Sequence, residues 1–166
     1  MKQMNHMTRI LVIVFSAILL LSGLAMAQNP KTMAPCSILT KAEIKAVIGQ
    51  DVSDGKLTGS GNAAAGAPCQ YTVGAGGVFS VLSKVAAPGE NAPKVMEELK
   101  KRKIPVVDAP GIGDRSFFSS PGYGMVQLNT FKGPHYLIIT MLVPGLSEAA
   151  QKTAATTLMN KALKKF

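Results

Sequence analysis

The amino-acid sequence predicts an α+β domain: a mainly antiparallel sheet with three helices packed against it, and one disulfide. Apolar residues recur at helical spacing in three segments, and strand-like segments lie between them in groups joined by short, glycine-rich turns. Such hairpin connections outnumber the long crossovers that parallel strands require, which favours antiparallel pairing. The chain has two cysteines, Cys36 and Cys69.

Residues 1–27 have the pattern of a secretory signal peptide. Lys2 and Arg9 make the start positive, an apolar run of 12 residues follows, and Ala25 and Ala27 are the small residues that a signal peptidase reads. An apolar run of that length is too short to span a bilayer, which needs about 20 residues. We therefore expect cleavage after Ala27 and a mature chain that does not span the membrane.

The expected mature chain is a flexible tail over residues 28–35 followed by a single domain over 36–166. Export places it in the periplasm or outside the cell, where two cysteines read as a disulfide between Cys36 and Cys69. A lipid anchor on Cys36 is the alternative. It is disfavoured because Pro35 precedes that cysteine and the apolar run ends far upstream.

The first helix carries the clearest sequence signals. Thr40 and Glu43 form a predicted capping box, in which each side chain satisfies a backbone N–H at the helix start. Leu39 and Ile44 occupy the positions of a hydrophobic staple, and Gly49 is suited to the left-handed residue that ends a helix.

A predicted hairpin follows this helix. Residues 51–57 form a short candidate strand, and residues 58–68 read as a flexible Gly- and Ala-rich loop. Strands over 70–73 and 78–85 are joined by a turn at 74–77, and the second of them alternates apolar and polar residues as a half-buried strand does.

Two further helices are expected. Asn91 caps a helix over 92–103, with acidic residues early and basic residues late, in agreement with the helix dipole. Ser147 caps a C-terminal helix with an apolar stripe. Between the two helices a turn-rich connector, 109–114, precedes three strands, at 115–119, 125–131 and 135–143. The last of these strands is apolar on both faces, so we expect it at the centre of the sheet.

The run from Cys36 to Ile44, with Gly49, Cys69-Gln70-Tyr71 and Gly111-Ile112-Gly113-Asp114, resembles a pattern shared by uncharacterised bacterial secreted and lipoprotein domains. The resemblance extends from Cys36 to the C-terminus. It implies an extracytoplasmic α+β domain with a disulfide, and it implies no catalytic residues. The chain departs from the lipoprotein members because it lacks a lipidation cysteine at the end of the signal peptide.

The mature sequence offers little for catalysis, and we expect no cofactor and no metal. Metal sites need several converging ligands, yet His135 is the one histidine after the signal peptide. A Ser–His–Asp hydrolase around His135 remains an alternative, although the Gly-x-Ser-x-Gly motif is missing. Asp108 and Asp114 flank a loop, as glycosidase carboxylates can, but Asp114 reads better as a turn former.

The formal net charge of +9 for the whole chain makes this a basic protein. The densest run, Lys100 to Lys103, is interpreted as the solvated end of a helix. Its alternative is attachment to an anionic envelope polymer. Nucleic acid is not an expected partner of an exported protein.

We therefore expect a noncatalytic binding or interaction module with an unknown envelope protein or small ligand as its partner. Its candidate interaction surface is the two loops 58–68 and 110–114, because binding residues gather on loops carried by a rigid scaffold. The candidate residues are Gly59, Gly61, Asn62, Gly111, Gly113 and Asp114.

Overall fold

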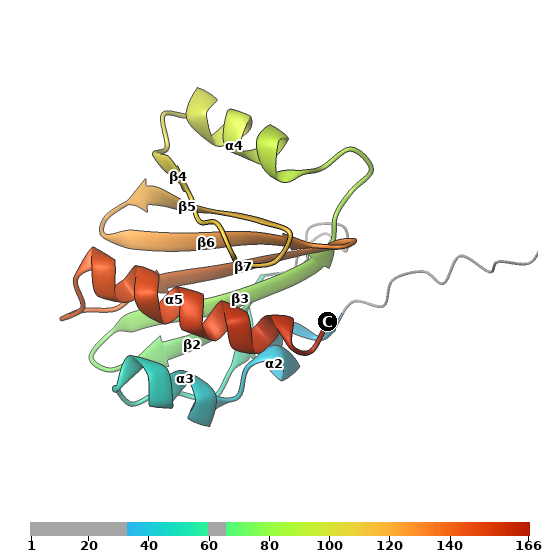
Figure 1. Ribbon diagram of the computed structural model, residues 1–166. Coiled ribbons are helices and arrows are strands. Elements are labelled where there is room, and N and C mark those ends of the chain that lie inside the picture. Colours follow the sequence, from blue (N-terminus) through green and yellow to red (C-terminus); the bar gives the residue numbers. More distant parts are fainter. Residues whose placement is uncertain (1–32, 60–65) are drawn as a thin grey trace, which may run out of the picture.

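The computed structural model describes residues 33–59 and 66–166. The predicted signal peptide, most of the predicted tail, and Gly61 and Asn62 lie outside these ranges. The described residues form four helices and seven strands (Figure 1). In chain order these are α2 (Pro35–Ile38), α3 (Lys41–Ile48), β1 (Lys56–Leu57), β2 (Cys69–Val73), β3 (Gly77–Val85), α4 (Ala92–Lys101), β4 (Val106–Asp108), β5 (Arg115–Gly122), β6 (Met125–Lys132), β7 (His135–Leu142) and α5 (Glu148–Leu163).

All of these strands join one antiparallel sheet in the order β1-β2-β3-β7-β6-β5-β4. The α+β class and the antiparallel pairing are thus confirmed. β7 lies between β3 and β6 at the centre, as its apolar residues on both faces predict. The long pairing of β3 with β7, from Val78↔Leu142 to Val85↔His135, joins the N-terminal strands to the C-terminal meander.

One face of the sheet carries the main core. Leu137, Ile139 and Met141 of β7 are fully buried and belong to the same apolar cluster as Leu158 and Met159 of α5. Figure 1 shows α5 lying across this face, with α2 and α3 below it. We call it the α5 face.

The opposite face, which we call the α4 face, carries a smaller core. Because side chains alternate along a strand, the residues between those of the main core point to this side. Phe117, Phe131 and Tyr136 are buried there against Ala92 and its neighbours on α4. Phe131 and Tyr136 stack with ring centroids 4.2 Å apart. In Figure 1, α4 stands apart from the other helices, above β4 and β5.

The predicted helix starts are confirmed. Thr40 and Glu43 form both hydrogen bonds of the capping box, and Gly49 ends α3 at φ 75°. Asn91 accepts a hydrogen bond from the Lys94 N–H at the start of α4, and Ser147 accepts one from Ala150 at the start of α5.

The end of α4 differs from the prediction. The helix stops at Lys101, two residues early, because Lys103 takes the left-handed conformation with φ 58°. The Lys103 N–H then donates to the Lys100 carbonyl at 2.9 Å and the Ile104 N–H to the Leu99 carbonyl at 3.0 Å. This pair of bonds is the Schellman motif, which usually has glycine where Lys103 stands.

Several strand boundaries also differ from the prediction, and one short strand and one short helix were not predicted. Of residues 51–57 only Lys56–Leu57 is strand, and Val52 forms an isolated bridge to Val73. Strand β4 was not predicted, and it is only three residues long. Strand β5 continues to Gly122 through a register shift after Ser119. The short helix α2 was not expected; its Ser37 N–H bonds to Ala34.

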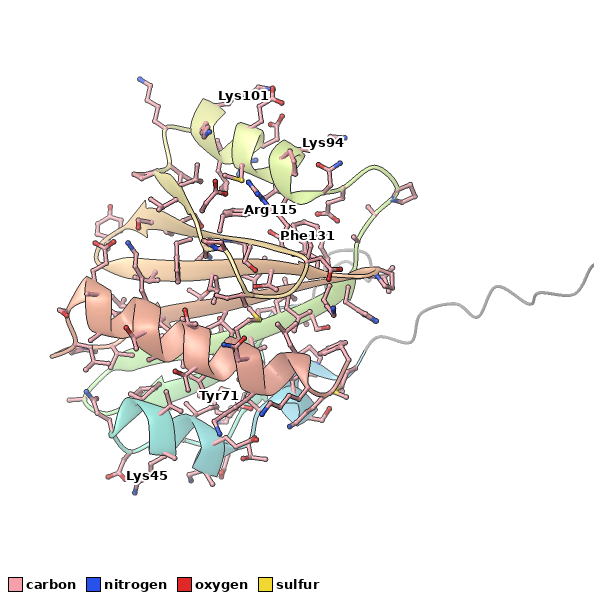
Figure 2. The ribbon with its side chains drawn as sticks, in the orientation of Figure 1. Lys45, Tyr71, Lys94, Lys101, Arg115 and Phe131 are labelled. Atoms are coloured by element: carbon pink, nitrogen blue, oxygen red, sulfur yellow. A yellow bond between two sulfur atoms is a disulfide. The ribbon has the colours of Figure 1, made fainter. Side chains whose placement is uncertain are left out.

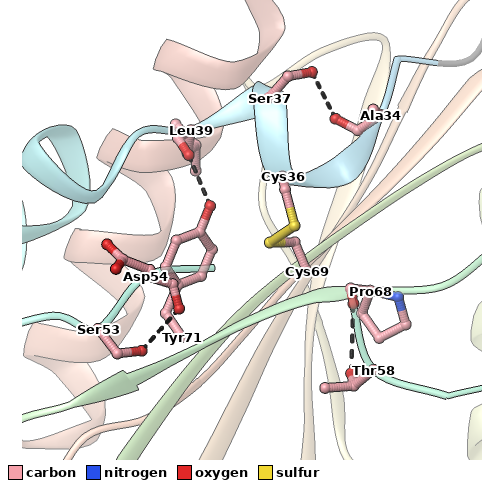
Figure 3. The surroundings of a disulfide bond; sticks show 10 residues. All are labelled: Ala34, Cys36, Ser37, Leu39, Ser53, Asp54, Thr58, Pro68, Cys69 and Tyr71. Carbon is pink, nitrogen blue, oxygen red and sulfur yellow. Dashed lines mark hydrogen bonds between the residues drawn. A yellow bond between two sulfur atoms is a disulfide. The ribbon is translucent and has the colours of Figure 1, made fainter. Parts of the chain in front are cut away.

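The Cys36–Cys69 disulfide is confirmed, with the two Cα atoms 5.0 Å apart. It ties α2 to the first residue of β2, as Figure 3 shows. Next to it, the buried Tyr71 donates its hydroxyl to the Leu39 carbonyl at 2.8 Å. These two links fasten the N-terminal segment onto the α5 face.

Candidate functional site

The two candidate loops lie near opposite edges of the sheet. Gly59 is exposed just after β1, whereas Gly111, Gly113 and Asp114 lie between β4 and β5 at the other edge. Strands β2 and β5 are four strand spacings apart, or roughly 19 Å at about 4.8 Å each. The described ends of the loop 58–68 and the connector 110–114 therefore lie far apart on the sheet.

The connector before β5 is fixed by packing and by hydrogen bonds. Gly113 has φ 58°, and a Cβ there would lie 2.7 Å from the Phe131 carbonyl oxygen. The Asp114 carboxylate accepts the Gly133 N–H at 2.6 Å and the Lys132 ammonium at 3.0 Å. Asp114 thus stabilises the turn between β6 and β7, whereas the sequence predicted that it would stabilise its own turn. The hydrogen bond from the Gly133 N–H lowers the pKa of Asp114 most, and the Lys132 ammonium lowers it further.

Shallow cavities nevertheless border both loops. One of about 290 Å³ lies at the connector, lined by Asp108, Gly111, Asp114 and Arg115 among others. Another, of about 320 Å³, lies beside Thr58 at the start of the first loop. Its lining also includes Lys56, Gln70 and Thr72, on the paired strands β1 and β2.

The hydrolase alternative gains no support from the described residues. Among them, the buried Nδ1 of His135 has no hydrogen-bond partner, and its ring packs against Phe166 at 4.8 Å. Asp108 is paired with Arg115 at 2.9 Å and Asp114 with Lys132. Neither carboxylate therefore accepts a hydrogen bond from His135, as the aspartate of a catalytic triad does.

A chain of hydrogen bonds crosses the α4 face. The Tyr136 hydroxyl donates to Asn129 at 2.7 Å, and the Asn129 amide donates to the Ser119 hydroxyl at 3.1 Å. The Ser119 hydroxyl contacts Gln127 at 3.4 Å, and the Gln127 amide donates to Thr140 at 3.2 Å. Tyr136, Asn129 and Ser119 are buried, whereas Gln127 and Thr140 are half-buried. Burial raises the pKa of Tyr136, so its phenol stays protonated and acts as a donor.

An ion pair joins this face to the segment that leads into α4. The Lys84 ammonium contacts both oxygens of Glu90, at 2.7 and 2.9 Å, and lies 5.3 Å from the centroid of the Tyr136 ring. Burial opposes ionisation of Glu90, but the hydrogen bonds from Lys84 and from the Ala87 N–H outweigh it and lower the pKa.

The largest of the three cavities runs beside α4. It holds about 410 Å³, within the range of about 300–1,000 Å³ usual for small-ligand sites. We call it the α4 groove. It is lined by Ala87, Pro88, Glu90, Lys94, Val95, Glu98, Leu99 and Arg102. Figure 2 shows Lys94 and Lys101 projecting from α4.

The α4 groove was not predicted from the sequence. The signal available was the spacing of Lys94, Glu98 and Arg102, which are four residues apart and share one flank of a helix. That spacing does not show how deeply the apolar residues beside these side chains are buried, so it does not predict a groove. Residues of the charge run from Lys100 to Lys103 have different surroundings. Arg102 lines the groove, whereas Lys101 forms ion pairs with Glu97 and Glu98.

No cluster of three or more metal-ligating side chains occurs in residues 33–59 and 66–166. Over the same residues, no helix has the length and apolar character needed to cross a membrane. Comparison with family models, with curated proteins and with solved structures finds no match to this chain.

Proposed function

We propose that the mature chain is a noncatalytic extracytoplasmic module that binds a ligand or partner on the α4 face of its sheet. The observation that carries the proposal is the position of the three cavities described above. The α4 groove adjoins Glu90, which is paired with Lys84 of that face. The ladder register places Lys56, Gln70 and Asp108, which line the other two cavities, on the same face.

The composition of this face supports a binding role. Helix α4 packs on β4 and β5 at one side, and its cluster extends to Tyr136 and Ile138 of β7 and to Ala86 just after β3. On the rest of this face, half-buried side chains mix apolar groups with hydroxyl and amide groups, as ligand-binding surfaces do. These half-buried residues are Gln70, Val78, Ser80, Leu82, Gln127, Thr140 and Leu142.

The disulfide supports the proposed compartment, because disulfides persist in oxidising surroundings. The signal-peptide pattern and the resemblance to secreted domains point the same way. The absence of a hydrogen-bonded triad around His135 in the described residues favours binding over hydrolysis.

The proposed binding face can be tested with two variants: one that blocks the α4 face and a control that carries matched substitutions on the α5 side. The blocking variant carries Thr72→Arg and Ser80→Arg, on β2 and β3. The control carries Thr153→Arg and Thr157→Arg, two exposed positions of α5. Immobilised mature protein is incubated with envelope extract, and retained proteins and small molecules are measured by mass spectrometry.

We expect the wild type and the control to retain the same specific molecule and the blocking variant to lose most of it. Equal retention by all three proteins would contradict the proposed face. If His135→Ala abolished a hydrolytic activity of the wild type, the hydrolase alternative would replace the proposal.

A further inference from the structure

The α4 groove has an apolar floor because α4 is incompletely covered. Ala92 is the one buried residue of this helix, although Val95, Met96 and Leu99 lie on the same apolar side. Those three side chains are half-buried, and Val95 and Leu99 line the groove together with Ala87 and Pro88. A hydrocarbon segment placed there would cover apolar area that water now contacts, which is favourable.

The charges around this floor are unbalanced. Glu90 is paired with Lys84 at 2.7 Å and Glu98 with Lys101 at 3.0 Å, so both acidic groups of the lining already have cationic partners. Lys94 and Arg102 have no carboxylate within 4.0 Å among the described residues. Among the described residues, no carboxylate contacts either of these two positive charges, which lie on one flank of α4 two helical turns apart. Lys94 is nevertheless near enough to Glu90 to help lower its pKa.

From this combination we infer that the α4 groove binds a single-chain amphipathic anion, specifically a long-chain carboxylate. The hydrocarbon chain lies on Val95 and Leu99, and the carboxylate is held by Arg102 or Lys94. Arg102 suits a carboxylate because its guanidinium can donate two parallel hydrogen bonds. The inference rests on the proposed function and names the ligand class for one part of the α4 face.

The test is a calorimetric titration of the mature protein with dodecanoate at low ionic strength. Dodecyltrimethylammonium has the same chain with a positive head, and butyrate has the same head with a short chain. The test variant is Lys94→Gln with Arg102→Gln. The matched control is Lys100→Gln with Lys103→Gln, which removes the same charge from exposed residues outside the groove lining.

We expect saturable, one-to-one binding of dodecanoate and no measurable binding of the other two compounds. The test variant should bind about tenfold more weakly, because the ion pair between the carboxylate and Arg102 or Lys94 is lost whichever of the two residues forms it. The control should stay within about twofold of the wild type, and circular dichroism should show both variants folded.

Three results would overturn the inference: no saturable binding of dodecanoate, equal binding of the cationic analogue, or equal weakening in the two variants. Binding to vesicles of anionic lipid without binding to dodecanoate would also overturn it, in favour of membrane-surface attachment. If dodecanoate fails while Thr72→Arg with Ser80→Arg still abolishes retention from envelope extract, the ligand class is wrong and the proposed function stands.

Discussion

Gly113 and Gly111 lie two residues apart in the connector, and both have positive φ, 58° and 83°. They differ in their surroundings. A Cβ on Gly113 would meet the Phe131 carbonyl oxygen and the Thr130 methyl group at 2.7 Å, whereas a Cβ on Gly111 meets nothing within 4 Å. The pair therefore separates the effect of backbone conformation from that of close packing.

Replacing Gly113 with alanine should lower the free energy of unfolding by about 2–4 kcal/mol, since left-handed strain and a backbone clash add together. Gly111→Ala should cost about 1 kcal/mol, from conformation alone. Urea denaturation of the two variants measures the difference. Equal losses would show that the connector can move away from β6.

Asp114 should contribute to the pH dependence of stability. Its pKa is lowered in the folded protein, so its contribution is fully present above the unfolded pKa of about 3.9 and is lost as the pH falls through the folded value. Asp114→Asn should be less stable than the wild type at pH 7, and the gap should narrow below about pH 4.

Urea midpoints measured across this range test the assignment, with Asp54→Asn as the control. Asp54 is exposed and contacts Lys41 at 3.3 Å, and among the described residues no backbone N–H donates to its carboxylate as Gly133 does to that of Asp114. A gap for Asp114→Asn that stays constant down to low pH would mean that the contact does not depend on ionisation.

The end of α4 shows how an element can depart from its sequence signals. Lysine occupies a left-handed position where glycine is preferred, and the Schellman bonds form around it. Lys103→Gly should therefore stabilise the protein by about 0.5–1 kcal/mol, because the strain is removed at a modest entropic cost in the unfolded chain.

Thermal unfolding of Lys103→Gly and Lys103→Ala checks this prediction. Alanine removes the charge and the long side chain but keeps the strain, so it should give no comparable gain. If the two variants melt at the same temperature, the benefit comes from losing the charge and not from the backbone conformation.

The helices with cap residues were predictable because the signals are local. Thr40 with Glu43, Asn91 and Ser147 each start a helix where the sequence indicates. The two-residue β1 and three-residue β4 were not predictable, since strands so short owe their existence to pairing with β2 and β5. The α4 groove was missed for a similar reason: it depends on how far α4 is covered by the sheet.

At the scale of the whole molecule, the disulfide connects the N-terminal segment to the sheet across 33 residues. Replacing both cysteines with serine should lower the free energy of unfolding by roughly 3–4 kcal/mol, because the unfolded chain regains the entropy of an open loop. Guanidinium denaturation of the double variant measures this. A loss below about 1 kcal/mol would mean that Tyr71 and the α3 contacts alone hold the segment in place.

The binding surface proposed for the molecule is the α4 face and not the α5 face. Two exposed threonines make a matched pair for testing it: Thr72 on the α4 face and Thr153 on the outer side of α5. A photo-crosslinking amino acid is placed at either position, and the cells that produce the protein are irradiated. We expect a discrete adduct from position 72 and none from position 153. An adduct from position 153 alone, or adducts of equal yield from both positions, would contradict it.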